Sequence, residues 1–370
     1  MDQAYISSVL ERLQPKVDRM IGQIGDKCPH VARQDGVYDS TGSDWWTSGF
    51  WPGLLWIMHD MTGKDHYKEA AWRWDEEIEP WLLQASEDLH HDVGFQFLST
   101  AVIKHKITGD ADGLRRGLQA ANFLAGRFNL AGRFIRAWNG DKIGWAIIDC
   151  TMNLSLLFWA SEASGDARFK HIAVAHADMA LEHFIRPDGS VNHIVSFDPE
   201  TGAFIESIGG QGYGPQSAWS RGQAWAIYGM ANTYKYTRQA RYIEAAKRVA
   251  HFFLASLPED HVPYWDFRDD HLEDAPRDSS AAAIAASGLL ELANHVSAAE
   301  ARFYTEAAKR ILKSLTESYA TWDLPEHEAI LLHGTGHKPA GENIDVSLIY
   351  GDYFYVEAFA KLGGWKRSIF

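Results

Sequence analysis

Apolar and polar positions along the chain define two kinds of helical segment. In the first kind, apolar residues occur nearly all round the helix. In the second kind, they recur every three to four residues, which is typical of a helix with one face in solvent. Short turns join the two kinds in pairs, and Gly63, Gly109 and Gly165 stand where a helix is expected to end. The segments of the first kind cover residues 50–61, 93–107, 151–163, 224–236 and 280–295.

These helix pairs predict a repeated architecture. An all-round apolar helix must be covered on both sides, so the pairs either stack as a solenoid or close into a double ring. The helices expected at 5–24 and 348–362 are able to pair with each other, which supplies a sixth pair and favours closure. Short β-type stretches at 190–197, 263–267 and 330–333 fall in the connections between pairs. We predict a ring with its active site at one mouth.

Composition narrows the function classes. The 370 residues are 46% hydrophobic, and no linker or shift in composition divides them, so we expect one domain over residues 1–370. The net charge of −14 argues against nucleic acid and against an anionic membrane surface as partners. Two cysteines, Cys28 and Cys150, are too few for a disulfide framework. No secretory signal and no membrane-spanning run is visible, which predicts a cytoplasmic protein, or a periplasmic one if a leader was removed.

Two aspartates have apolar neighbours at positions where a loop enters an apolar helix. Asp92 lies within residues 90–95 and Asp149 within residues 146–150. Burial of this kind raises a carboxyl pKa and keeps a proton available near neutral pH, as a general acid requires. The alternative is that both side chains cap a helix N-terminus, which is the commoner use of a single aspartate at such a position.

Aromatic and polar residues occur together in several expected loops, at 44–51, 138–140, 209–212 and 218–225. Aromatic faces pack on the apolar face of a sugar ring, and polar side chains bind its hydroxyl and carboxylate groups. About half of the 15 tryptophans are expected in the core, but Trp46, Trp219 and Trp225 adjoin Gly, Ser or Arg. Arg221 is a fork-shaped donor suited to a carboxylate, with a structural ion pair as the alternative.

Six ordered segments together resemble glycoside hydrolase family 88, the unsaturated glucuronyl hydrolases. They are WTSGFWPG (46–53), HHDVGF (90–95), IIDC (147–150), WSRGQAW (219–225), RDSSA (277–281) and GDYFY (351–355). The resemblance runs from about residue 29 to about residue 362. It implies an all-α (α/α)6 barrel, in agreement with the six helix pairs. It also implies an anionic substrate, an oligosaccharide that a polysaccharide lyase has left with a terminal 4,5-unsaturated uronic acid.

The resemblance further implies the roles of individual residues. Asp149 matches the acid/base that protonates C4 of the double bond and assists attack of water at C5. Asp92 matches the aspartate that positions the uronate ring. The matching substrate-binding residues are Trp46, His91, His193, Gln211, Trp219, Arg221, Trp225 and, more loosely, Tyr353. This hydration of an enol ether needs no cofactor and no metal, and His327, His333 and His337 follow no known metal spacing.

Several alternatives remain open. The related family 105, whose members act on unsaturated rhamnogalacturonan fragments, carries Asn-Gly-Trp where this chain has Gln223-Ala224-Trp225. A glycosidase or epimerase of saturated sugars could use the same barrel, and a non-catalytic sugar-binding protein would keep the tryptophans. The source polysaccharide (glycosaminoglycan, ulvan, gellan or xanthan) and the oligomeric state are not determined. The loop 337–343 is expected over the cleft, where Lys338 would contact a sulfate or be solvated.

Overall fold

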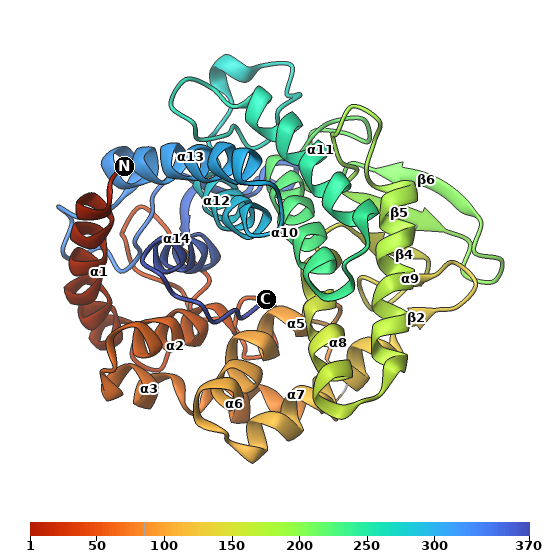
Figure 1. The fold of residues 1–370 in the computed structure, drawn as a ribbon, viewed down its shortest axis with the longest axis horizontal. Helices are drawn as coiled ribbons and strands as arrows, with labels where there is room; N and C mark the ends of the chain where they lie inside the picture. Colours follow the sequence, from red (N-terminus) through yellow and green to blue (C-terminus); the bar gives the residue numbers. More distant parts are fainter. Residues whose placement is uncertain (85) are drawn as a thin grey trace.

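The computed structural model describes residues 1–84 and 86–370. Its helices form two concentric rings (Figure 1). Neighbouring inner helices contact each other in the order α2, α5–η2–α6, α8, α10, α12, α14 and back to α2. The inner ring consists of α2 (Phe50–Thr62), α5 (Val93–Phe97), η2 (Leu98–Val102), α6 (Ile103–Thr108), α8 (Cys150–Ser164), α10 (Ser220–Thr237), α12 (Ser279–Ala293) and α14 (Ile349–Leu362). The predicted (α/α)6 barrel is confirmed.

The outer ring contains the partner of each inner helix. Its members are α1 (Gln3–Ile24), α3 (Asp65–Ala71) with α4 (Trp74–Ile78) and η1 (Glu79–Leu82), α7 (Ala111–Gly126), α9 (Ala167–His183), α11 (Ala240–Ser256), and α13 (Ala298–Ser314) with η4 (Leu315–Tyr319). Helices α1 and α14 pack together, so the predicted closing pair is confirmed. No helix in the described ranges is long and apolar enough to cross a bilayer.

The glycine turns form as their sequence predicts. Gly63, Gly109 and Gly165 end α2, α6 and α8 with φ values of +70°, +76° and +74°, a conformation that a residue with a Cβ adopts only with strain. The side chains of Asp110 and Asp166 then each accept a backbone N–H at the start of the following helix. These turns fix the antiparallel pairing that builds the two rings.

Short strands occupy the connections at one mouth of the ring. They are β1 (Val31–Ala32), β2 (Phe128–Asn129), β3 (Phe134–Ile135), β4 (Trp145–Ile147), β5 (Ile194–Phe197), β6 (Phe204–Ile208), β7 (Gly334–His337) and β8 (Glu342–Leu348), with the short helices η3 (Leu272–Asp274) and η5 (Lys338–Ala340). They form the antiparallel sheets β4-β5-β6, β1-β8-β7 and β2-β3.

The predicted β-type stretches are only partly confirmed. Residues 190–197 contain β5, whereas 263–267 and 330–333 form isolated bridges. Strands β6 and β8 were not predicted. β6 exposes the adjacent apolar residues Phe204 and Ile205 and lacks the alternation of a half-buried strand. β8 does alternate apolar and polar residues at 344–348, and sequence reasoning missed this signal. The pairing of Ile147 with Ile194 brings the residues just after β4 beside the residue just before β5.

Candidate active site

A cavity of about 450 Å³ opens at the mouth of the inner ring. The loops before α2, α5, α8, α10 and α14 supply its walls, together with the two three-stranded sheets. Its lining includes His30, Trp45, Trp46, His90, His91, Asp92, Trp138, Lys142, Trp145, Asp149, His193, Gln211, Arg221, His337, Glu342, Asn343 and Tyr350. Asp149, His91 and Arg221, which the resemblance implies act on one substrate, all line this cavity.

Asp92 and Asp149 occupy equivalent positions, each immediately before an inner helix. Asp92 precedes α5 and Asp149 precedes α8, but neither side chain makes a capping hydrogen bond. The interpretation of these residues as helix caps is therefore wrong. Both side chains line the cavity instead, so the chain forgoes the roughly 1 kcal/mol that a cap contributes at each of two helix starts.

Asp149 is held in a poorly solvated position. Its side chain is 14% exposed, and its Oδ1 has no hydrogen-bond partner among the described residues. Burial, together with the nearby charge of Asp92, raises the pKa of Asp149 to about 7. A carboxyl group with this pKa is substantially protonated at neutral pH, so it can donate a proton and take one back.

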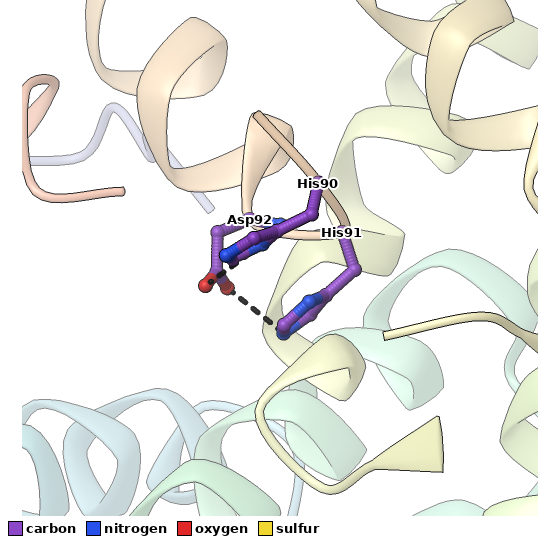
Figure 2. A group of neighbouring side chains, drawn as sticks. All are labelled: His90, His91 and Asp92. Atoms are coloured by element: carbon purple, nitrogen blue, oxygen red, sulfur yellow. Dashed lines mark hydrogen bonds and ion pairs between the residues drawn. The ribbon is translucent and has the colours of Figure 1, made fainter. Parts of the chain in front are cut away.

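Asp92 has the opposite electrostatic environment. Its carboxylate lies 3.1 Å from His91 Nε2 and 3.6 Å from His90 Nδ1, and it accepts a hydrogen bond of 3.1 Å from Asn153 Nδ2 (Figure 2 shows the two histidines). Burial alone would raise the pKa of Asp92, but His91, His90 and Asn153 together hold it below its usual value. The cavity therefore contains an ionised carboxylate near a protonated one, and such a divergent pair is suited to acid–base chemistry.

The same three side chains, His90, His91 and Asp92, place potential metal-ligand atoms within 4.8 Å of one another. Their mutual contacts already pair these atoms, and His91 Nδ1 lies 2.9 Å from the carbonyl oxygen of Ala137, which fixes the ring. We assign the cluster to the acid–base site, where it stabilises the charge of Asp92.

His193 lies across from Asp149. Its Nε2 is 3.9 Å from Asp149 Oδ1, and its Nδ1 lies 2.9 Å from the backbone nitrogen of Gln211 and 3.1 Å from the backbone carbonyl oxygen of Gly209. Burial lowers the pKa of His193 to about 3, so the ring is neutral at physiological pH. The Gln211 N–H can only donate and the Gly209 oxygen can only accept, so the contacts of Nδ1 fit either neutral tautomer. Nε2 faces Asp149 as a donor in one tautomer and as an acceptor in the other.

Arg221 lines the cavity, but its donors are used within the protein. Its guanidinium donates to Asp278 Oδ2 (2.8 Å) and to the backbone carbonyls of Thr335 (2.6 Å) and Gly336 (2.7 Å). Gln211 Nε2 donates to the same Gly336 carbonyl at 3.0 Å. The structural ion pair considered for Arg221 is confirmed, and the residue fastens β7 to α10. Asp278 also caps α12, as its sequence context predicts.

Four predicted substrate-binding residues do not line the cavity. Trp225 is fully buried and packs on Phe95, with ring centroids 5.0 Å apart. Tyr353 is fully buried and donates a hydrogen bond to Glu357. The structure places both residues outside the cavity, because an inner helix turns only one side toward the mouth and these residues face the aromatic core.

The other two residues lie beside the cavity. Trp219 is 3% exposed and packs behind His193, with ring centroids 4.2 Å apart, so it supports the wall. The 337–343 loop reaches the cavity through His337, Glu342 and Asn343, as predicted. Lys338 does not line the cavity, because its ammonium lies 3.0 Å from Asp269 Oδ2. The two predicted states of Lys338, bound to a sulfate or solvated, are therefore replaced by an ion pair within the protein.

Trp46, which was predicted, is half-buried and packs on Tyr350, with ring centroids 4.9 Å apart.

Sequence reasoning missed several residues of the site. Tyr350, His30 and Lys142 were not identified, because each is a single residue brought to the cavity by distant segments. Asn153 was also missed, although its position four residues after Asp149 on a helix places both on one face.

A double ring of helices with a divergent aspartate pair in an aromatic cavity defines a carbohydrate-active hydrolase of the (α/α)6 type. The sequence model of Glycosyl Hydrolase Family 88 matches residues 16–370, and the chain belongs to this family. The chain is 38% identical over 353 residues to the unsaturated glucuronyl hydrolase of Bacillus sp. (strain GL1), with 93% of each protein covered.

Solved structures agree with this assignment. The crystal structure of an unsaturated glucuronyl hydrolase from Streptococcus agalactiae matches with a TM-score of 0.95 and 31% identity, covering 100% of this chain and 94% of that one. A mutant of the Streptococcus agalactiae enzyme complexed with dGlcA-GalNAc6S matches with a TM-score of 0.87 and 29% identity, again over 100% and 94% of the two chains.

Proposed function

We propose that the protein removes the terminal 4,5-unsaturated uronic acid from lyase-generated oligosaccharides by hydrating the enol-ether double bond. One observation carries the proposal: Asp149, with its pKa raised to about 7, lies in the same cavity as Asp92, whose pKa is held low. Membership of family 88 supports the same activity.

The proposed reaction begins with Asp149 protonated. Asp149 donates its proton to C4 of the double bond, and positive charge develops at C5 and the ring oxygen. The Asp149 carboxylate then takes a proton from water as that water attacks C5. The resulting hemiketal collapses, which opens the ring and releases the remaining sugar. Asp92 stays ionised, holds the uronate ring and stabilises the developing positive charge.

The remaining cavity residues bind the sugar in this proposal. Trp46 offers an aromatic face, and His91, His193 and Gln211 lie beside the aspartates. Arg221 is better supported as a residue that shapes the rim than as a free carboxylate clamp, because its guanidinium already donates to three protein acceptors.

The test is a panel of unsaturated disaccharides prepared with lyases from glycosaminoglycans, ulvan, gellan and xanthan. Turnover is followed as the loss of the ultraviolet absorbance of the double bond. We expect activity on at least one member, none on the matched saturated disaccharides, and none with Asp149→Asn. Activity on saturated sugars alone would replace the proposal with an ordinary glycosidase.

A cytoplasmic location is also proposed, because the only two cysteines, Cys28 and Cys150, are both buried and unpaired. Fractionation of the producing cells, with activity assayed in each fraction, tests this location.

A further inference from the structure

We infer that Asn153 is a positioning residue that holds the Asp92 carboxylate toward the reacting sugar and links it to the start of the helix bearing Asp149. This inference rests on the proposed function. Asn153 lies on α8 and is fully buried. It does not line the cavity and is not exposed to solvent, so its role is exerted through the two aspartates that do line the cavity.

The orientation of the Asn153 amide is determined by its surroundings. Its Oδ1 accepts a hydrogen bond of 2.7 Å from the backbone N–H of Phe95, a group that can only donate. The NH2 group must therefore face the other way, where it donates to Asp92 Oδ1 at 3.1 Å. The same Nδ2 lies 3.4 Å from the backbone carbonyl of Asp149, one turn earlier on α8. One amide thus connects Asp92 and Asp149, the residues that immediately precede α5 and α8.

The close approach of the two helices depends on Gly94. A Cβ at position 94 would lie 2.4 Å from Asn153 Oδ1 and 2.8 Å from Asn153 Cα, which is inside van der Waals contact. The absence of a side chain at Gly94 therefore allows α5 to approach α8 closely enough for the Asn153–Asp92 hydrogen bond. Gly94 and Asn153 together therefore determine the relative positions of the two carboxylates.

This contact has an electrostatic consequence. A hydrogen bond donated to a carboxylate favours its charged form, so Asn153 supports the ionised state of Asp92. The charge of Asp92 in turn helps to keep Asp149 protonated. The other titratable or charged groups that face the pair are His90, His91, Arg127, Cys150, His193 and Arg221. None of these groups contacts both aspartates through one hydrogen-bonding side chain.

The test compares Asn153→Leu, which keeps the shape and removes the hydrogen bonds, with Ser155→Ala on the same helix as the control. We expect Asn153→Leu to reduce kcat at least tenfold. The acidic limb of the pH profile of kcat/KM should also move to higher pH, because Asp92 loses a hydrogen-bond donor and is protonated more easily. A merely structural role would reduce activity and leave both limbs of the profile in place.

Carboxyl titration by 13C NMR of the labelled protein follows the aspartates directly and needs no substrate. A raised pKa of Asp92 in Asn153→Leu supports the inference even if every disaccharide is rejected, in which case only the proposed function fails. Unchanged aspartate titrations overturn the inference even if the wild type is active. If Asn153→Leu does not fold, Asn153→Ala provides the same comparison.

A second inference concerns the cavity rim and also rests on the proposed function. We propose that Lys142 binds an anionic substituent, sulfate or carboxylate, on the sugar that follows the unsaturated ring. Lys142 lines the cavity, its side chain is exposed, and its ammonium lies over the rings of Trp138 and Trp145 at 5.3 and 5.0 Å. No carboxylate of the described residues lies within ion-pair distance of it. By contrast, Arg221 and Lys338 are paired with aspartates.

The test measures KM for sulfated and unsulfated unsaturated disaccharides with Lys142→Gln, and uses Lys338→Gln as the matched control. We expect a severalfold rise in KM for the sulfated sugar with Lys142→Gln alone. Equal effects of Lys142→Gln on both sugars would overturn the assignment, as would a selective effect of Lys338→Gln. Calorimetry with a sulfated saturated disaccharide compares the affinities of Lys142→Gln and Lys338→Gln without turnover. This test of Lys142 therefore remains decisive even if the hydrolase proposal fails.

Discussion

His193 Nε2 faces Asp149 Oδ1 across 3.9 Å, and neither atom has a hydrogen-bond partner among the described residues. This separation is too long for a direct hydrogen bond, but one oxygen atom between the two could bond to both at ordinary distances. The neutral His193 ring can bond to such an oxygen through Nε2, as donor or as acceptor, while Asp149 removes or supplies a proton. The arrangement suits the water molecule that the proposed hydration requires.

Asp149→Asn should fold normally and lose at least 100-fold in kcat, because the amide keeps the shape of the side chain but cannot transfer a proton. Steady-state kinetics on an unsaturated disaccharide, with circular dichroism as the control for folding, checks this outcome. A variant that retains a tenth of wild-type activity would remove Asp149 from the acid/base role.

Asp92→Asn should also lose most of its activity, with a smaller reduction in kcat than Asp149→Asn and with substrate binding retained. The neutral amide no longer stabilises developing positive charge, but it fills the same space beside His91. Calorimetric titration with the disaccharide measures the retained affinity. Loss of binding together with turnover would assign Asp92 mainly to substrate recognition.

The pH dependence of kcat/KM should fall on the basic side near pH 7, where Asp149 loses its proton. It should stay high below that pH until Asp92 becomes protonated, at a value below the usual range for an aspartate. Initial rates between pH 4 and pH 9, corrected for enzyme stability, should show the basic limb and a plateau on its acidic side. Activity that increases through pH 8 would contradict a protonated Asp149.

Asp149→Asn should be more stable than the wild type at alkaline pH. Because the folded protein raises the pKa of Asp149 to about 7, it holds more protons than the unfolded chain between about pH 4 and pH 7, so wild-type stability falls as pH increases through that window. One pKa unit corresponds to about 1.4 kcal/mol, so the variant's advantage in unfolding free energy should grow by at most about 2–3 kcal/mol between pH 5 and pH 8. Urea unfolding at both values measures it, with Ser155→Ala expected to show no such trend.

Much of the fold could be predicted from the sequence because each helix pair carries a local signal. The apolar inner helices, the glycine turns and the closing pair of α1 with α14 all follow from residues close together in the chain. The strands at the mouth could not be predicted in the same way. Several of their pairings join distant segments, such as β1 with β8, and β6 lacks the alternation that marks a half-buried strand.

The site was predictable to a similar degree. Asp92, Asp149, His91 and His193 were identified from motifs and lie together in the cavity. Trp225 was misassigned, because a motif does not say which side of a helix faces the core. Asn153 escaped notice because its importance depends on a contact with Asp92, 61 positions away, that only the packed structure reveals.

The ion pair between Arg221 and Asp278 has a consequence for how the substrate arrives. A cation that is neutralised at 2.8 Å by a buried carboxylate projects little field beyond the cavity, and the chain as a whole carries a net charge of −14. An anionic sugar is therefore not drawn in from a distance, and its capture depends on short-range hydrogen bonds and aromatic contact. For an unsulfated disaccharide, kcat/KM should then change little with ionic strength, or increase slightly as salt screens the acidic surface.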